Sequence, residues 1–286
     1  MTKTSTRRRI LRTVGAATAV SLAGCSSSGD ETTTGTTGGT KNETTTADGS
    51  TAGTGTTSDG TTSETGTTDE ATTGEETDGT TTGGTEPPKG GGDVRFSTKS
   101  GATVQGTLLG DGTCGVVFAH GVGFDRRSWL PQARSLAEQG YTCLTIDLIL
   151  DDRTTTVGYV LAAIRYLRQR VGVKNVVLIG ASAGANAVVR ANAQAKSGTI
   201  DGTLALSPGK SADSASGMQG WKLFVVSKGD KQRFVQTTKQ MHENAPNPKR
   251  YEEISGSAHG QHAFEENDYA MQSLMNELLN TVCGGE

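Results

Sequence analysis

The sequence is poor in the residues that most metal and cofactor sites require. Its 286 residues include four cysteines and four histidines, and His, Cys and Asp nowhere stand at the spacing of a metal site. No Gly-x-Gly-x-x-Gly pattern follows an expected strand, so the dinucleotide-binding fingerprint is also missing. We therefore expect neither a metal ion nor a cofactor.

Aromatic residues and clustered positive charge are scarce as well. Phe, Trp and Tyr make up 5% of the chain, and the few aromatics favour a small or moderately sized substrate over a long-chain lipid. Residues 94–286 hold twenty basic and seventeen acidic side chains, and the basic ones are scattered along the sequence. This distribution predicts no nucleic-acid partner.

An export segment is expected over residues 1–25. Paired arginines in Arg7-Arg8-Arg9 precede an apolar run at residues 14–23 that is too short to span a bilayer. The run ends in Leu-Ala-Gly-Cys25, which resembles the lipobox of prokaryotic lipoproteins, and the arginines resemble a twin-arginine signal. The resemblance implies lipidation at Cys25 and attachment to the outer face of the cytoplasmic membrane, with the lipid as the chain's contact with the membrane. An ordinary signal peptide is the alternative.

Residues 26–93 differ sharply in composition from the rest of the chain. They consist mainly of Thr, Gly, Ser, Asp and Glu, with two basic and thirteen acidic side chains. Such a segment buries too little apolar surface to offset the entropy of ordering. We expect a disordered stalk here and a single folded domain over residues 94–286.

Strand and helix patterns alternate along residues 94–286. Strands are expected at 94–97, 102–109, 115–119, 141–148, 175–179, 202–206, 222–226 and 251–254. Helices are expected at 127–139, 156–170, 185–195, 233–243 and 264–282. Alternation of this kind predicts an α/β fold with a mostly parallel, doubly wound sheet, helices on both faces and an antiparallel hairpin at the start. The stretch between 206 and 222 is too short for a lid subdomain.

The most informative motif is Gly180-Ala181-Ser182-Ala183-Gly184. It joins a buried strand pattern to a run of small, helix-forming residues, which predicts a strand, a sharp turn and a helix with Ser182 at the apex. Residues beside such a turn must have almost no side chain to avoid clashes. The serine would stand at a helix N-terminus, where free N–H groups favour developing negative charge.

Three further motifs follow expected strands. They are His120-Gly121 after the third strand, Asp230 after the seventh, and Ser257-Ala258-His259-Gly260 after the last. Together with the serine turn they resemble a small, lidless, esterase-like or dienelactone-hydrolase-like α/β-hydrolase over residues 94–286, in the family's order of Ser, Asp and His. The resemblance implies the α/β-hydrolase fold.

The matched positions imply a catalytic triad. Ser182 would be the nucleophile, His259 the base that takes its proton, and Asp230 the acid that fixes the tautomer of the imidazole. The backbone N–H groups of Val122 and Ala183 would form the oxyanion hole.

Two of these assignments have competitors. His262 lies three residues beyond His259 and could serve as the base, although we favour a surface position for it. Asp147 ends the fourth expected strand and could replace Asp230, although an aspartate at a strand end more often caps a turn.

Four other polar residues near the expected site have structural explanations. The ring of His120 is expected to bond loop backbone beside the oxyanion turn. Arg126 and Arg127 could bind an anionic group of the substrate, but we favour the interpretation that both side chains are solvated at the start of a helix. We expect Asn186 to serve packing.

The cysteines leave their pairing open. Three remain after lipidation of Cys25, so one disulfide can form within the chain. Cys114 and Cys143 lie at or in neighbouring expected strands and could pair, or could stay buried as thiols.

These residues together predict a serine hydrolase that cleaves a small-molecule carboxylic ester, in preference to an amide, through an acyl-enzyme. The alternative is a surface binding module that keeps the fold and has lost catalysis.

Overall fold

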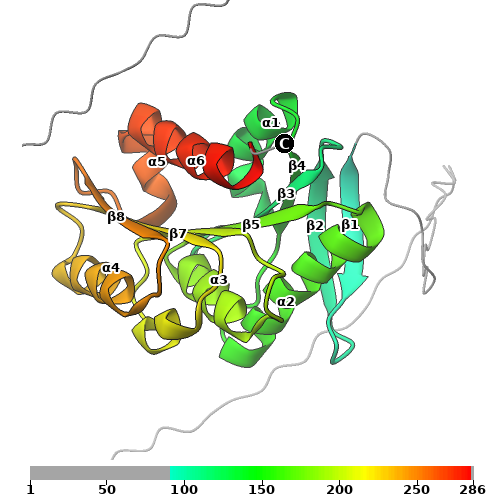
Figure 1. The fold of residues 1–286 in the computed structure, drawn as a ribbon, viewed down its shortest axis with the longest axis horizontal. Coiled ribbons are helices and arrows are strands. Elements are labelled where there is room, and N and C mark those ends of the chain that lie inside the picture. Colours follow the sequence, from blue (N-terminus) through cyan, green and yellow to red (C-terminus); the bar gives the residue numbers. More distant parts are fainter. Residues whose placement is uncertain (1–90, 285–286) are drawn as a thin grey trace, which may run out of the picture. The chain divides into compact units, whose positions relative to one another are not determined.

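The computed structural model describes residues 91–284, which form an eight-stranded sheet with helices on both faces (Figure 1). The strands are β1 (Gly92–Ser97), β2 (Thr103–Leu109), β3 (Cys114–Ala119), β4 (Thr142–Ile146), β5 (Asn175–Ala181), β6 (Gly202–Leu206), β7 (Trp221–Ser227) and β8 (Lys249–Ile254). The helices are α1 (Leu130–Glu138), α2 (Arg153–Tyr166), α3 (Ala183–Gln194), α4 (Gln232–Asn244), α5 (Ala263–Glu266) and α6 (Asp268–Cys283). The predicted export segment, its Cys25 and the predicted stalk lie outside the described residues.

The sheet is parallel except at its first edge. Its strand order is β1-β2-β4-β3-β5-β6-β7-β8, in which β1 with β2 and β2 with β4 are antiparallel and every other pair is parallel. Parallel neighbours need crossover connections, which the helices supply. The prediction of a mostly parallel, doubly wound sheet with an antiparallel start is confirmed.

Both faces of the sheet are covered, and β3 shows how the sequence achieves this. All six of its residues are buried. Val116 and Phe118 pack into the core beneath α1 and α6, while Val117 and Ala119 pack into the core beneath α2 and α3. Successive strand residues point to opposite faces, so a strand buried on both sides must be apolar throughout. Figure 1 shows α1, α5 and α6 on one side of the sheet and α2, α3 and α4 on the other.

The helix bounds shift by one to four residues from those expected, and two of the departures have a clear local cause. α2 begins at Arg153 because the Asp152 carboxylate accepts hydrogen bonds from the N–H groups of Thr154 and Thr155, both at 3.0 Å. The single helix expected over residues 264–282 was wrong at Asn267. The backbone there has a φ of −140°, which interrupts the helix and separates α5 from α6.

The disulfide joins Cys114 to Cys283, so the suggested pairing of Cys114 with Cys143 was wrong. β3 and β4 are neighbours, but Cys143 lies opposite Val116 in the register of the two strands. The last residue of α6 instead meets the first residue of β3. Cys143 remains a buried thiol, and burial raises its pKa to about 12.

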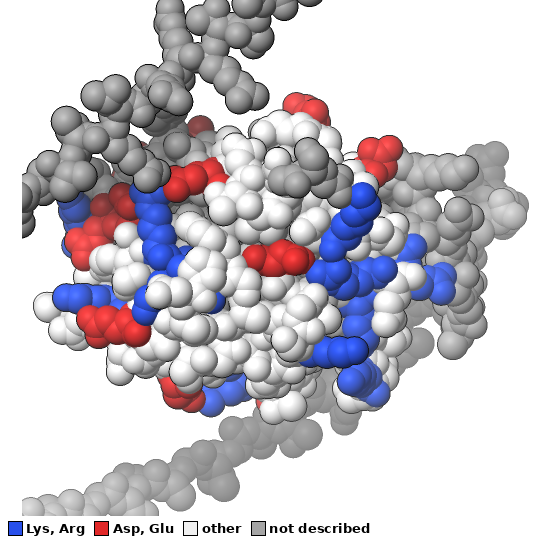
Figure 2. Space-filling model, viewed as in Figure 1, with Lys and Arg blue, Asp and Glu red and all other residues white. Residues whose placement is uncertain are grey.

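Charge is unevenly spread over the surface. Figure 2 shows Lys and Arg side chains gathered on the right of one face, whereas both signs of charge mix on the left. Several basic side chains are held in ion pairs, among them Arg168 with Asp201 at 2.8 Å and Arg250 with Glu277 at 2.6 Å. Within residues 91–284, no helix combines the length and apolar character needed to cross a membrane.

Candidate active site

Ser182 lies at a strained turn between β5 and α3. Its backbone has a φ of 52° and a ψ of −111°, a conformation that residues other than glycine rarely adopt. Two hydrogen bonds hold it there. The Ser182 N–H donates to the Leu206 carbonyl at 2.8 Å, and the Ser182 carbonyl accepts from the Asn186 N–H at 3.1 Å. The turn therefore holds the serine between the end of β5 and the first turn of α3.

The two flanking glycines allow this turn to close. A Cβ atom on Gly184 would lie 2.1 Å from the Ala119 carbonyl oxygen, and one on Gly180 would lie 2.5 Å from the Gly184 oxygen. Both obstacles are backbone atoms, so a side chain could not be accommodated without moving the sheet. This is the physical reason for the glycines in the motif.

Ser182, His259 and Asp230 form a continuous chain of hydrogen bonds. His259 Nε2 lies 2.8 Å from Ser182 Oγ, and His259 Nδ1 lies 2.8 Å from Asp230 Oδ2. The Asp230 side chain is 2% exposed, and its other oxygen accepts a hydrogen bond from the Lys231 N–H at 2.7 Å. A carboxylate can only accept, so Nδ1 carries the proton and Nε2 is free to accept one from the serine.

The loop that carries His259 is fixed by side chains from outside it. The Glu266 carboxylate accepts hydrogen bonds from the N–H groups of Ser257 and Ala258 at 2.8 and 2.7 Å. The ring of Phe234, from α4, lies with its centroid 3.9 Å from that of the imidazole. The imidazole is thus held in place from two directions.

The two residues expected to supply oxyanion donors lie in the turn after β3 and at the start of α3. The Gly121 N–H already donates to Gln261 Oε1 at 2.8 Å, which leaves Val122 as the next amide along the chain. Ala183 is the first residue of α3, so its N–H has no acceptor within the helix. Val122, Ser182 and Ala183 line the same cleft.

Gln261 links this turn to the short 3-10 helix Arg126–Trp129. Its Nε2 donates to Ser128 Oγ at 2.8 Å, and its Oε1 accepts from the Gly121 N–H.

We predict that Gln261→Ala lowers kcat about tenfold with little change in KM. Without Gln261 the turn at Gly121 and Val122 is displaced, which weakens only the interaction made by the developing oxyanion. Steady-state kinetics test this positioning role. A rise in KM at unchanged kcat would contradict it, and recovery of kcat in Gln261→Glu would support it because the carboxylate can still accept from Gly121.

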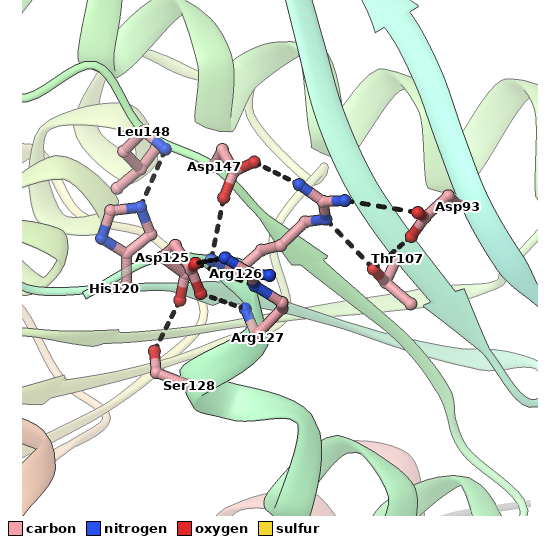
Figure 3. A network of polar contacts seen from close by, with 9 residues as sticks. All are labelled: Asp93, Thr107, His120, Asp125, Arg126, Arg127, Ser128, Asp147 and Leu148. Atoms are coloured by element: carbon pink, nitrogen blue, oxygen red, sulfur yellow. Dashed lines mark hydrogen bonds and ion pairs between the residues drawn. The ribbon is translucent and has the colours of Figure 1, made fainter.

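His120 bonds loop backbone, as expected. Its Nε2 accepts a hydrogen bond from the Leu148 N–H at 3.0 Å (Figure 3). Its Nδ1 lies 2.8 Å from the Gly121 carbonyl oxygen. The ring therefore ties the end of β3 to the segment after β4 and is 3% exposed.

The competing acid and base are engaged elsewhere. Asp147 pairs with Arg126 at 2.5 Å, and the same guanidinium reaches Asp93 at 3.3 Å (Figure 3). His262 is exposed and lies 2.9 Å from Glu265. Neither residue contacts Ser182, so the structure brings together the favoured set.

The two arginines that could have bound an anionic substrate group, Arg126 and Arg127, are instead bonded to nearby side chains. Besides its two carboxylate partners, Arg126 Nε donates to Thr107 Oγ1 at 3.2 Å. Arg127 donates to Asp125 at 2.6 Å, and this hydrogen bond lowers the pKa of the aspartate. Neither arginine lines the cleft that contains Ser182.

That cleft has a volume of about 530 Å³. α3 contributes Ser182 at its N-cap together with Ala183, Asn186, Ala187 and Arg190. α2 contributes Arg153, Thr156 and Val157, and the far wall holds Gly209, Lys210, Arg233 and Phe234. Asn186, expected to serve packing, instead lines the cleft, and its Oδ1 accepts from the Lys210 N–H at 2.9 Å.

Sequence reasoning missed several residues that position the site. Gln261, Glu266 and Phe234 act through contacts between segments distant in the fold, and no local pattern marks them. Gln261 alone had a usable signal, its place two residues beyond His259. Within the described part of the chain, no group of three His, Cys, Asp or Glu side chains is placed to hold a metal ion.

Comparisons with solved structures identify the fold. A dienelactone hydrolase of Anabaena variabilis matches with a TM-score of 0.59 and 21% identity, covering 68% of this chain and 99% of that one. An esterase of Pyrococcus furiosus matches with a TM-score of 0.58 and 16% identity, covering 67% and 92%. Est1E from Butyrivibrio proteoclasticus matches with a TM-score of 0.56 and 16% identity, covering 66% and 99%.

The comparison with curated protein sequences found no match. The family model described as "Alpha/beta hydrolase family" matches residues 116–275, which is more than half of the chain and includes the serine turn, Asp230 and the His259 loop. The chain therefore belongs to the alpha/beta hydrolase family.

Proposed function

We propose that this protein is a serine hydrolase that cleaves a carboxylic ester through an acyl-enzyme. The observation that carries the proposal is the hydrogen-bonded chain Ser182–His259–Asp230, whose serine lines an open cleft. A serine hydroxyl attacks a carbonyl only when a base takes its proton, and His259 Nε2 is within 2.8 Å of that hydroxyl.

In acylation, Ser182 Oγ attacks the ester carbonyl carbon and its proton passes to His259 Nε2. The buried Asp230 carboxylate stabilises the imidazolium that results. The N–H groups of Val122 and Ala183 stabilise the negative charge on the carbonyl oxygen. When the tetrahedral intermediate collapses, the C–O bond to the alcohol breaks and His259 returns the proton to the leaving alcohol.

Deacylation repeats these steps with water. His259 removes a proton from the water, the hydroxide attacks the acyl carbon, and the bond to Ser182 Oγ breaks. His259 then gives the proton back to the serine, which releases a carboxylic acid and restores the enzyme.

Two observations favour an ester of small or moderate size. The solved structures of similar fold include proteins named as an esterase and a dienelactone hydrolase. The cleft volume of about 530 Å³ suits a small molecule.

A panel of p-nitrophenyl esters from acetate to laurate tests the proposal. We expect turnover with a preference for the shorter acyl chains. A folded protein that hydrolyses none of the panel and no aryl amide would contradict the proposal and favour a binding module of the same fold.

We also propose that the hydrolase is exported and lipid-anchored through Cys25, on the strength of the Arg7-Arg8 pair and the Leu-Ala-Gly-Cys25 motif. Cys25→Ser is expected to move the protein from the membrane fraction to the soluble fraction of a prokaryotic host. Equal membrane association of the variant and the parent would contradict lipid anchoring. Cys143→Ser is the matched control, because its buried thiol takes no part in anchoring.

A further inference from the structure

The cleft beside Ser182 is strongly basic. Four of its lining residues are cationic, namely Arg153, Arg190, Lys210 and Arg233, whereas Asp151 is its one acidic lining residue. They come from different elements: α2, α3, the loop after β6 and α4. Four segments distant in the sequence thus place like charges around one cleft.

These four cations lack carboxylate partners within the described residues. Elsewhere in the domain Arg126, Arg168 and Arg250 each form ion pairs, but no ion pair between residues 91–284 involves any of the four. Arg190 is half-buried, and its burial together with the nearby charge of Arg153 lowers its pKa. The charge of Asp213 opposes this lowering in part, and the other three cations are exposed. A partly dehydrated cation beside a like charge is costly until an anion joins it, and this cost falls mainly on Arg190 with Arg153.

The cleft also fixes the distance between the Ala183 N–H and Arg190 along α3. Ala183, Asn186, Ala187 and Arg190 all line it, at the i, i+3, i+4, i+7 spacing of one helix face. Arg190 therefore lies about 10 Å along α3 from the N–H of Ala183. The floor between them consists of two alanines and an asparagine, which leaves room for a chain of several carbons.

Arg233 places one of these positive charges near His259, with the ring of Phe234 between them. Its guanidinium carbon lies 4.5 Å from the centroid of the Phe234 ring, and that ring packs on His259. On the same wall, Asn186 Oδ1 holds the Lys210 backbone at 2.9 Å. The cleft is therefore a shaped site with positive charge along its wall.

We propose that the substrate is an ester carrying an anionic oxygen group, a carboxylate or a phosphate, about 10 Å from the scissile carbonyl, and that Arg190 with Arg153 binds this group. The inference rests on the proposed ester hydrolysis and adds the class of substrate. Arginine forks match carboxylate and phosphate oxygens in paired hydrogen bonds, which supplies affinity and fixes the register of the ester.

A pair of esters that differ only in charge tests the inference. Mono-p-nitrophenyl suberate carries a free carboxylate that an extended chain places about 10 Å from the ester carbonyl, and p-nitrophenyl methyl suberate is its neutral counterpart. We expect the protein to hydrolyse the anionic ester with a kcat/KM about tenfold or more above that of the neutral one. This advantage is expected to shrink between 20 mM and 500 mM salt. A matched p-nitrophenyl ester ending in a phosphate distinguishes the two anions.

The variants assign the effect to the cleft. Arg190→Gln is expected to lower kcat/KM for the anionic ester about tenfold and to leave the neutral ester within about twofold. Arg153→Gln, on the exposed first residue of α2, should act in the same direction and serves if Arg190→Gln fails to fold. Arg134→Gln removes the same charge from the exposed surface of α1 and should change neither ester.

The outcomes separate this inference from the proposed function. Hydrolysis of both esters at equal kcat/KM, or an equal effect of Arg190→Gln on both, overturns the anionic substrate and leaves ester hydrolysis intact. Hydrolysis of neither ester counts against ester hydrolysis, and calorimetry with monomethyl suberate then decides the inference. Binding that is lost in Arg190→Gln supports the anion site, and absence of binding overturns it.

Discussion

Ser182→Ala is expected to lower kcat for ester hydrolysis by a factor of about 10⁴ or more. The Ser182 hydroxyl is the atom that His259 Nε2 reaches at 2.8 Å, and alanine leaves no nucleophile in its place. The residual activity would come from substrate binding and from the donors at Val122 and Ala183. Alanine keeps the Cβ atom and the strained backbone, so the turn between β5 and α3 should persist.

The measurement is kcat on the best ester of the panel, with circular dichroism and Tm to verify the fold. Ser273→Ala, on the exposed face of α6, is the matched control and should keep full activity. If Ser182→Ala retained activity within tenfold of the parent while Ser273→Ala behaved normally, the nucleophile would be a different residue.

Asp230→Asn should lower kcat by about 10⁴ while changing the fold little. The Asp230 carboxylate can only accept from His259, which keeps the proton on Nδ1 and leaves Nε2 able to accept one from Ser182. An asparagine that turns its amide N–H₂ toward Nδ1 forces the opposite tautomer, in which Nε2 carries the proton and cannot act as a base. The Asp230 side chain is 2% exposed, so water cannot replace the lost carboxylate.

Asp147→Asn provides the matched control, because Asp147 was the competing acid and the structure pairs it with Arg126. We expect its kcat to stay within about tenfold of the parent. A large loss in Asp147→Asn and a small one in Asp230→Asn would reverse the assignment of the acid. Measured kcat values for both variants on one ester decide between them.

Much of the fold could be predicted because the sequence repeats simple patterns. A strand buried on both faces, such as β3, is apolar at every position, and a helix such as α6 carries a stripe of apolar residues along one face. The serine turn was predictable for a harder reason. Gly180 and Gly184 stand where a Cβ atom would strike backbone, so the local sequence records a steric requirement of the fold.

The remaining features depend on contacts that no local pattern encodes. The pairing of Cys114 with Cys283 follows from the end of α6 lying against the start of β3, and strand adjacency alone pointed to Cys143 instead. Gln261 holds the oxyanion turn from another loop. The cations of the cleft come from four separate segments, so neither their number nor their convergence could be seen in the sequence.

Labelling with a fluorophosphonate tests the central claim most directly. An activated serine attacks the phosphorus and expels fluoride, which leaves a stable phosphonyl group on its oxygen. We predict one group per chain, mapped to the peptide that contains Ser182 and absent from Ser182→Ala. Folded protein that takes up no label, or label found on another residue, would contradict the claim that Ser182 is the activated nucleophile.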